Sequence, residues 1–548
     1  MTKKLLLCIS IVFFTNILFA NTPPTIFNFR IVSSEPDKVY FDSDKIITGS
    51  NTVGFTISNK SISRITINEG QLSNHYVTVS SKFTYWDNNT IRYEGGSDIK
   101  DSSNNGLIEF TLSYINNNIV EPEANDERYV TTAASGGGDG KSESSSWTLE
   151  EAFDKANAGM TVWIKSGNYG NQNLSLYNDG TAVRPLKFIG YKNSPGDITK
   201  NYYDYGKAWS SVEMPTLTGS SASKGHAIQL RSVNYVVFRN LQIKNYQFGI
   251  RANNTKNSNL VFDRINGNTF GKDSNNGNDI NASFLSLQTY VSGSGARPNT
   301  SNNNMKVLNC RSVNASMASF VLYGDGNNLI ENTKSYSDRT GIYERLDYHI
   351  SINGHNNIVT NCHAENFNNT ETNGSTHGIG VRGSSNLYNT YNLIEKSRGI
   401  NIQECFYIRN YGCEYNVIKD VYAGNNGSKS SEDRGGIWIW GGSNYNIIER
   451  VIVEDVDFGI GFKDNTEEGN IDNNDIGHDN IIRNSVFRNN KYVIRAWGTT
   501  SSALTNNLIY NNTFDGAKWF WRGVKGDVIV SKLIFINNQI LNISNKYP

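Results

Sequence analysis

The sequence predicts an all-β chain in which a small N-terminal β-sandwich precedes a long right-handed parallel β-helix. Short strand-like stretches alternate with Gly, Asn and Ser turns along the 548 residues. Pairs of apolar residues recur from residue 236 onward, as in solenoid proteins. Glycine occurs 49 times and proline only 9 times, so turns are frequent and strands are seldom interrupted.

Residues 1–20 have the pattern of an export signal. Lys3 and Lys4 precede an apolar run from Leu5 to Phe14, and Ala20 ends a small-residue cleavage site. This run is too short to cross a bilayer comfortably, and no later segment is apolar enough to do so. We therefore expect a secreted or periplasmic protein that has no membrane partner.

Residues 24–121 predict the small β-sandwich, because several short alternating strands fall within about 100 residues. The polar stretch "VEPEANDE" then suggests a linker at residues 122–128, and the β-helix is expected from 129 to 548. The first domain is either a spacer or a carbohydrate-binding module.

The β-helix region opens with a short amphipathic helix. Thr148 and Glu151 form a capping box at its start, and the strand "TVWIKSG" follows. The preceding Gly-rich stretch lacks the Gly-Lys-Ser/Thr ending of a phosphate-binding loop, so we interpret it as a turn.

The rest of the chain repeats. From Val307 on, successive apolar pairs are 22 to 35 residues apart. A leucine-rich repeat is the main alternative, but its leucine and asparagine spacing and its helical segment are missing. Coils of a parallel β-helix would stack about 4.8 Å apart. The recurrent pairs are Val307-Leu308, Leu329-Ile330, Ile358-Val359, Leu393-Ile394, Val417-Ile418, Ile447-Ile448, Ile481-Ile482, Leu508-Ile509 and Leu533-Ile534.

Asparagines and cysteines of the repeat have structural explanations. The doubled Asn before many apolar pairs predicts turns, because Asn tolerates left-handed backbone. Cys310 and Cys362 occupy equivalent positions two coils apart, roughly 9.6 Å, which is too far for a disulfide. Cys405 and Cys413 could pair across a tight excursion.

Each coil has a second strand whose outward positions carry unusual residues. A solvent-facing sheet normally shows Ser, Thr, Asn and Lys, whereas these columns show aromatic and cationic side chains. Rings could cover the apolar faces of sugars, and Arg and Lys could bind sulfate or carboxylate groups. The expected substrate-binding residues are Arg382, Tyr407, Arg409, Trp438, Trp440, Lys463, Arg495 and Trp497.

Candidate catalytic groups lie near the starts of the same strands. His349 and His377 are expected on the exposed face, where an imidazole can move protons near neutral pH. A glycosidase needs two carboxylates about 5 to 9.5 Å apart. Glu404 and Asp347 are the preferred pair, with Asp433 as a substitute.

Two other functions stay open at this stage. A lyase would neutralise a uronate carboxylate and abstract a ring proton, with Tyr407, Arg409, Lys463 and His377 as candidates. A non-catalytic glycan-binding β-helix is the third possibility. The acidic segment "KDNTEEGNIDNNDIGHDN" could bind calcium, although it matches no defined calcium loop. No other cofactor is implied, and the metal ligands are unknown.

The charge balance limits the partners. Lys and Arg total 51, as do Asp and Glu, so the chain lacks the positive excess of a nucleic-acid binder. We expect a monomer that acts on an anionic polysaccharide.

The opening "GGGDGKSESSSWTLEEAFDKANAGMTVWIKSGNYG" and the Asn-rich coils after it resemble the pectate-lyase-like superfamily of right-handed β-helix proteins. The resemblance covers about residues 129 to 548. It implies a polysaccharide-degrading enzyme, either a glycoside hydrolase such as a carrageenase or fucanase, or a polysaccharide lyase. The whole arrangement resembles secreted enzymes of marine Bacteroidetes. The resemblance leaves the reaction class open. Our first hypothesis is an endo-acting hydrolase of an anionic, sulfated algal polysaccharide, and the linkage stays open.

Overall fold

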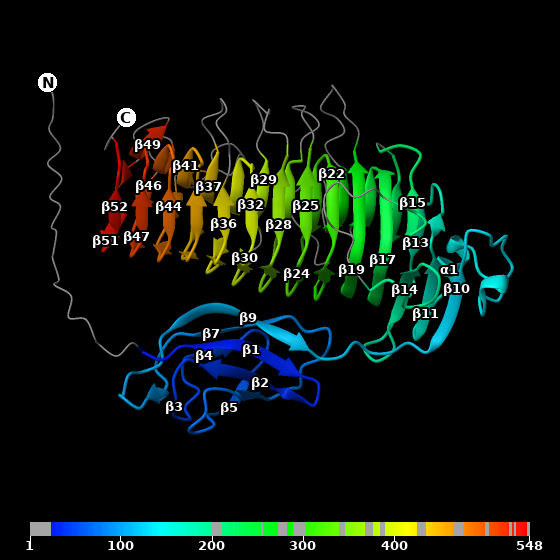
Figure 1. Ribbon diagram of the computed structural model, residues 1–548, viewed down its shortest axis with the longest axis horizontal. Helices are drawn as coiled ribbons and strands as arrows, with labels where there is room; N and C mark the ends of the chain where they lie inside the picture. Colours follow the sequence, from blue (N-terminus) through cyan, green and yellow to red (C-terminus); the bar gives the residue numbers. More distant parts are fainter. Residues whose placement is uncertain are drawn as a thin grey trace. The chain divides into compact units, whose positions relative to one another are not determined.

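The computed structural model contains an extended stack of parallel strands and a separate small β unit (Figure 1). The described residues are 23–199, 210–222, 224–253, 256–271, 282–288, 303–338, 346–367, 376–383, 389–410, 412–424, 434–464, 475–498, 503–524, 529–530 and 533–544. The proposed export signal, Asp433 and most of the acidic segment lie outside these ranges.

The chain divides into two compact units, one of residues 1–82 and 91–111, the other of residues 83–90 and 112–548. Strands near the N-terminus pair in the order β4-β7-β9-β1-β2-β6-β5, and β3 pairs with β8. Their bounds are β1 Ile26–Val32, β2 Glu35–Ser43, β3 Ile47–Thr48, β4 Phe55–Ile57, β5 Ile62–Thr66, β6 His75–Val79, β7 Asn89–Tyr93, β8 Lys100–Asp101 and β9 Phe110–Asn118.

The expected linker does not match this division. β10 (Asp126–Val130) is already the first strand of the large parallel sheet. Residues from Leu112 on also belong to the second unit, where the ammonium of buried Lys419 donates to the Leu112 carbonyl at 2.5 Å.

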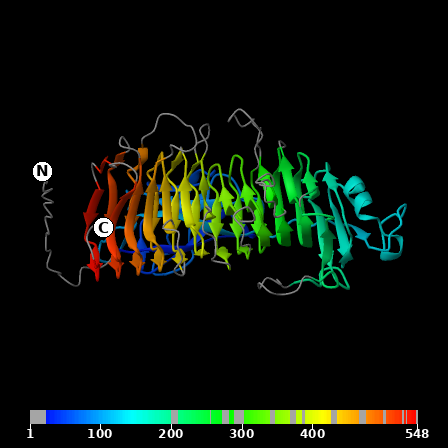
Figure 2. The ribbon, with the colours of Figure 1, turned by 90° about the horizontal axis from the view of Figure 1, so that it is seen from above.

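Two long sheets make up the second unit, and the predicted parallel β-helix is confirmed (Figures 1 and 2). After η1 (Glu143–Ser145), α1 (Leu149–Lys155) begins at Thr148, whose hydroxyl and the Glu151 carboxylate form the predicted capping box. The sheet that carries the candidate site has 12 strands. They are β13 Leu174–Leu176, β16 His226–Leu230, β18 Phe248–Asn253, β20 Ser283–Gln288, β23 Ala318–Leu322, β26 Tyr348–Ile352, β29 His377–Arg382, β33 Glu404–Arg409, β37 Gly435–Trp440, β41 Phe458–Lys463, β45 Tyr492–Trp497 and β49 Trp519–Val524.

The other long sheet has 25 strands, mostly two per coil. After β10 they are β11 Met160–Lys165, β12 Gly167–Asn168, β14 Leu186–Tyr191, β15 Pro215–Thr218, β17 Asn234–Tyr246, β19 Ser258–Phe270, β21 Lys306–Leu308, β22 Arg311–Ala315, β24 Leu329–Glu331, β25 Lys334–Ser337, β27 Ile358–Thr360, β28 His363–Asn366, β31 Leu393–Glu395, β32 Arg398–Ile400, β35 Val417–Lys419, β36 Tyr422–Gly424, β39 Ile447–Glu449, β40 Ile452–Glu454, β43 Ile481–Arg483, β44 Val486–Arg488, β47 Asn507–Tyr510, β48 Thr513–Asp515, β51 Leu533–Ile536 and β52 Gln539–Leu541. Two three-stranded sheets complete the coils: β30 Asn389–Thr390, β34 Cys413–Glu414 and β38 Ser443–Asn444, then β42 Asp475–His478, β46 Ala503–Thr505 and β50 Ile529–Val530.

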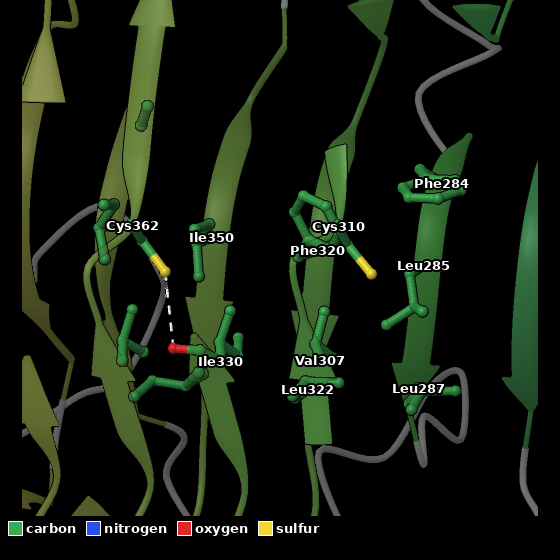
Figure 3. Packing of buried hydrophobic residues seen from close by; sticks show 14 of the residues in the cluster. Phe284, Leu285, Leu287, Val307, Cys310, Phe320, Leu322, Ile330, Ile350 and Cys362 are labelled. Atoms are coloured by element: carbon green, nitrogen blue, oxygen red, sulfur yellow. Dashed lines mark hydrogen bonds between the residues drawn. The ribbon is translucent and has the colours of Figure 1, made fainter. Parts of the chain in front are cut away.

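The interior between the sheets is filled by side chains that stack from coil to coil (Figure 3). Phe188, Phe238 and Phe262 stack almost in parallel, with ring centroids 5.4 and 5.7 Å apart. Cys310 and Cys362 are buried free thiols, and the Cys362 thiol donates to the Ile330 carbonyl at 3.5 Å. These contacts join neighbouring coils through a continuous core.

The doubled asparagines have two separate roles. In the first of each pair, as at Asn327 and Asn356, φ is 56° and 54°, which confirms the predicted left-handed turn. The second is buried, as is the Asn at the same position of coils in which Tyr or Asp precedes it, and each side-chain amide donates to the equivalent Asn of the next coil. This ladder runs through Asn328, Asn357, Asn392, Asn416, Asn446, Asn480 and Asn507, with bonds of 2.8 to 3.1 Å.

We predict that Asn416→Leu lowers the free energy of unfolding by about 3 kcal/mol, because ladder donors and acceptors are then buried without partners, each at a cost of about 1 to 3 kcal/mol. Urea unfolding followed by far-ultraviolet circular dichroism measures the change. Asn361→Gly is the control, since Asn361 is exposed with φ of 53° and Gly accepts that backbone. Equal stability of the two variants would contradict a structural role for the ladder.

Candidate functional site

The candidate site lies on the outer face of the 12-stranded sheet, where strict in-out alternation is broken. In β33, Cys405, Phe406 and Ile408 belong to the interior core, whereas Tyr407 belongs to a separate aromatic cluster on the outer face. Two consecutive residues therefore point inward. Glu404, which precedes them, lies beside His377, and His377 packs against the outer-face residue Tyr407, so the first residue of the strand points outward.

This break overturns the expected position of only one of the two histidines. His377 pairs in register with Tyr348 and Glu404 and lies on the outer face. His349 is fully buried, and its ring nitrogens contact the Ser335 hydroxyl at 2.8 Å and the Asn366 amide oxygen at 3.1 Å. Burial lowers the pKa of His349 to about 3. The expectation of an exposed His349 is wrong, and the residue fits a neutral internal hydrogen-bonding role.

His377 joins the two carboxylates that the sequence favoured as a pair. The Asp347 carboxylate lies 3.2 Å from Nδ1 of His377, and Glu404 Oε2 lies 3.3 Å from Nε2. Asp347 precedes β26 and Glu404 begins β33, so the two come from coils two strand spacings apart, about 9.6 Å. The imidazole therefore lies between two acids from different coils.

The two carboxyl groups have opposite pKa shifts. Burial raises the pKa of Glu404, and the nearby positive charges only partly offset it. For Asp347, burial also acts to raise the pKa, but the hydrogen bond to His377 and the charges of His377, Arg382 and Arg409 prevail, so its pKa is lowered. Glu404 therefore keeps its proton to a higher pH than an ordinary glutamate, and Asp347 ionises at a lower pH than an ordinary aspartate.

Further contacts fix the imidazole. Its ring stacks on Tyr348, with centroids 4.6 Å apart and an interplanar angle of 18°. The Arg409 guanidinium contacts Nε2 of His377 and also donates to the Tyr348 hydroxyl at 3.3 Å. When the imidazole is neutral, Nε2 can accept from Arg409, because arginine only donates, and the ring proton is then assigned to Nδ1, which faces Asp347.

Aromatic rings hold the cationic side chains of the face. The guanidinium of Arg409 and the ammonium of Lys463 lie 4.2 and 4.0 Å from the Trp440 ring centroid. Arg495 lies 3.9 Å from the ring of Trp497, and that ring stacks on Trp438 at 4.7 Å. Each cation–ring contact is attractive because the ring face is negative.

The expected stacking of sugars on Trp438 and Trp440 does not fit this arrangement. The two side chains are 3% and 5% exposed, and neighbouring rings and cations cover them. Their indole N–H groups are buried and have no hydrogen-bond partner within the described ranges. Gly461 allows the close packing, since a Cβ there would lie 2.5 Å from Phe458 and 3.1 Å from Trp438.

The structure brings together most of the predicted site residues. Arg382 joins the group through Tyr348, whose ring centroid lies 5.0 Å from its guanidinium. The sequence analysis missed Tyr348, Phe458, Tyr492 and Arg522, which share this face; the Tyr492 hydroxyl accepts from Arg522 at 2.6 Å. Tyr348, Phe458 and Tyr492 share one strand position, which strict alternation assigned to the interior, whereas Arg522 is in register with the outward-facing Arg495.

A metal site is not evident in the described part of the chain, which holds no group of three or more His, Cys, Asp or Glu placed to bind an ion. Calcium binding by the acidic segment stays a prediction. Among the same residues, no helix combines the length and apolar character needed to cross a membrane.

Comparison with models of protein families and with curated proteins finds no match. Among solved structures, a family 136 lacto-N-biosidase from Eubacterium ramulus is similar, with 12% identity, TM-score 0.47, and coverage of 76% of this chain and 68% of that one. The catalytic domain of a family 87 α-1,3-glucanase has 14% identity, TM-score 0.43 and 94% coverage of both chains. A pectate lyase has 13% identity, TM-score 0.35, and coverage of 71% and 78%. At these values, none of the likenesses identifies the activity of this chain.

We predict that Glu404→Gln stabilises the protein more at pH 8 than at pH 4. The raised pKa of Glu404 means that its ionisation disfavours the folded state as pH rises above the ordinary value of 4.5, and Gln removes this penalty. Thermal unfolding of both proteins at the two pH values measures the difference. The exposed Glu123→Gln is the control. A stabilisation that is equal at the two pH values, or larger at pH 4, would contradict the raised pKa.

Proposed function

We propose that this chain is a polysaccharide-cleaving enzyme whose substrate binds on the outer face of the 12-stranded sheet. Within that class we propose an endo-acting glycoside hydrolase for an anionic polysaccharide. The export pattern at the N-terminus supports action outside the cytoplasm, in the periplasm or the medium.

The observation that carries this proposal is the pair of carboxyl groups with opposite pKa shifts around His377. Hydrolysis of a glycosidic bond needs one protonated carboxyl group to protonate the leaving oxygen and one ionised carboxylate to assist attack. Glu404 would be the acid and Asp347 the base. Asp347 also reaches solvent, with 29% of its side chain exposed, so water can approach it.

The imidazole of His377 separates the two carboxyl groups, which contact its two ring nitrogens at 3.2 and 3.3 Å. An acid and a base held apart in this way fit an inverting enzyme better than a retaining one, whose carboxyl groups are only about 5 to 5.5 Å apart. His377 would hold Asp347 in place and keep it ionised. In this mechanism a water deprotonated by Asp347 attacks the anomeric carbon while Glu404 donates its proton to the departing sugar oxygen.

The anionic substrate is supported by the cations on the outer face of this sheet, of which Arg382, Lys463 and Arg522 are partly exposed. They lie on successive or nearby strands and include Arg382, Arg409, Lys463, Arg495 and Arg522. Sulfate and uronate groups both fit these donors.

A polysaccharide lyase is the second candidate, and the contact between Arg409 and His377 favours it. A neutral imidazole could take the ring proton next to a uronate carboxylate while an arginine neutralises that carboxylate. The two reactions differ in products, because elimination leaves an unsaturated sugar that absorbs ultraviolet light.

The test is digestion of polygalacturonate, alginate, carrageenan, fucoidan and α-1,3-glucan, with size-exclusion analysis, reducing-end measurement and ultraviolet detection. We expect one anionic polymer to be shortened with new reducing ends and without ultraviolet absorbance. Absorbance would support the lyase. Binding of a polymer without shortening would leave a non-catalytic glycan-binding protein and contradict both enzymatic proposals.

We predict that Glu404→Gln and Asp347→Asn each lower kcat by about 10²- to 10⁴-fold, the usual contribution of general acid–base catalysis. Initial rates on the polymer identified above, measured over a range of pH, check this. Asp347→Asn should remove the acidic limb of the pH profile and Glu404→Gln the basic limb. Glu123→Gln is the matched control, and near-normal kcat in both site variants would contradict the assignment.

A further inference from the structure

A second cationic cluster lies on the same sheet, toward its N-terminal end. Gln229 of β16 and Arg251 of β18 are neighbours in register, and Arg231 directly follows β16. His226 begins β16 and pairs with Phe248. Strands β20, β23 and β26 separate β18 from β29, so Arg251 is four strand spacings from His377, about 19 Å.

The contacts of these arginines do not include an acid. The Arg231 guanidinium donates to the Gln229 amide oxygen at 2.8 Å, and its Nε–H is buried with no hydrogen-bond partner in the described structure. Arg251 lies over the Phe248 ring, 4.5 Å from its centroid. Within the described ranges, neither arginine forms an ion pair with Asp or Glu.

The cluster is electrostatically unfavourable on its own. Burial lowers the pKa of Arg251, and the positive charge of Arg231 lowers it further. Burial also lowers the pKa of His226, and the charges of Arg251 and Arg231 add to this effect. Like charges that are half-buried together are normally balanced by an anion, because unpaired charges are costly to desolvate.

We infer that Arg231 and Arg251, together with His226, form an anion-binding site that takes a carboxylate or sulfate group of a polysaccharide. The fork of each guanidinium can donate two parallel hydrogen bonds to such a group. The Arg231 Nε–H, which has no hydrogen-bond partner in the described structure, would donate one of these hydrogen bonds. Its use as a distal subsite, four strands from the acid–base pair, rests on the proposed function.

The first test uses sodium sulfate as the probe. Sulfate should raise the thermal midpoint of the wild type more than that of Arg231→Gln/Arg251→Gln, at ionic strength matched with sodium chloride. The comparison between proteins removes the general stabilising effect of sulfate. Without sulfate, the double variant should be at least as stable as the wild type, because two like charges are removed. Equal sulfate shifts in the two proteins would overturn the anion site.

Arg398→Gln is the matched control. Arg398 is exposed on β32 of the other long sheet and lies over the ring of Tyr422 at 4.9 Å, which repeats the ring contact of Arg251. Its sulfate shift should equal that of the wild type. Should the double variant fail to fold, Arg251→Lys keeps the charge but loses the fork, and it should show a smaller sulfate shift than the wild type. If sulfate raised the thermal midpoint of Arg251→Lys as much as that of the wild type, bidentate binding by Arg251 would be overturned.

A second test measures polymer binding in the Glu404→Gln background, by affinity electrophoresis in gels with polygalacturonate, dextran sulfate or neutral dextran. Adding Arg231→Gln/Arg251→Gln to this background removes two charge-assisted contacts and should weaken binding to a polyanion at least tenfold. The polymer whose binding is weakened shows whether the site takes a carboxylate or a sulfate group. Unchanged binding to both polyanions, or equal binding to neutral dextran, would overturn the proposal. Persistent cleavage by Glu404→Gln would instead overturn the catalytic assignment and leave the anion result intact.

Discussion

In-register parallel pairing between equivalent strands of successive coils is the constraint on which the rest of the structure depends. Each strand of the 12-stranded sheet pairs with the same positions of the next, so a residue type placed once per coil becomes a continuous column. The buried asparagine ladder holds the same register at a corner of the coils. Asp347, His377 and Glu404, which are far apart in sequence, meet only because of this register.

Burial then gives these side chains their chemistry. Glu404 and His377 are each about 2% exposed, and rings of the aromatic cluster pack against His377. In such surroundings a charge persists only where partners balance it. Asp347 has those partners and is stabilised as a carboxylate, whereas desolvation dominates at Glu404. The rings that were expected to stack on sugars instead hold Arg409, Lys463 and Arg495.

The fold could be predicted from the sequence repeat, but the orientation of individual side chains was less predictable. Apolar pairs and doubled asparagines report stacking and left-handed turns directly, so the parallel β-helix and the turn at Asn327 were predictable. The two consecutive inward residues near the strand starts were not predictable, because side chains of a strand normally alternate between its two faces. Because of this departure from alternation, the His349 side chain lies in the interior and the His377 side chain lies between the two acids. The contact of Glu404 with His377 across neighbouring coils was also beyond single-sequence patterning.

The most direct test of the account is the order in which the two carboxyl groups titrate. Infrared difference spectra of the wild type against Glu404→Gln and against Asp347→Asn, recorded across pH, isolate the carboxyl band of each residue. We expect Glu404 to lose its proton at a higher pH than Asp347. Titration of Asp347 at the higher pH, or of both groups together, would contradict the separation of acid and base on which the proposed chemistry rests.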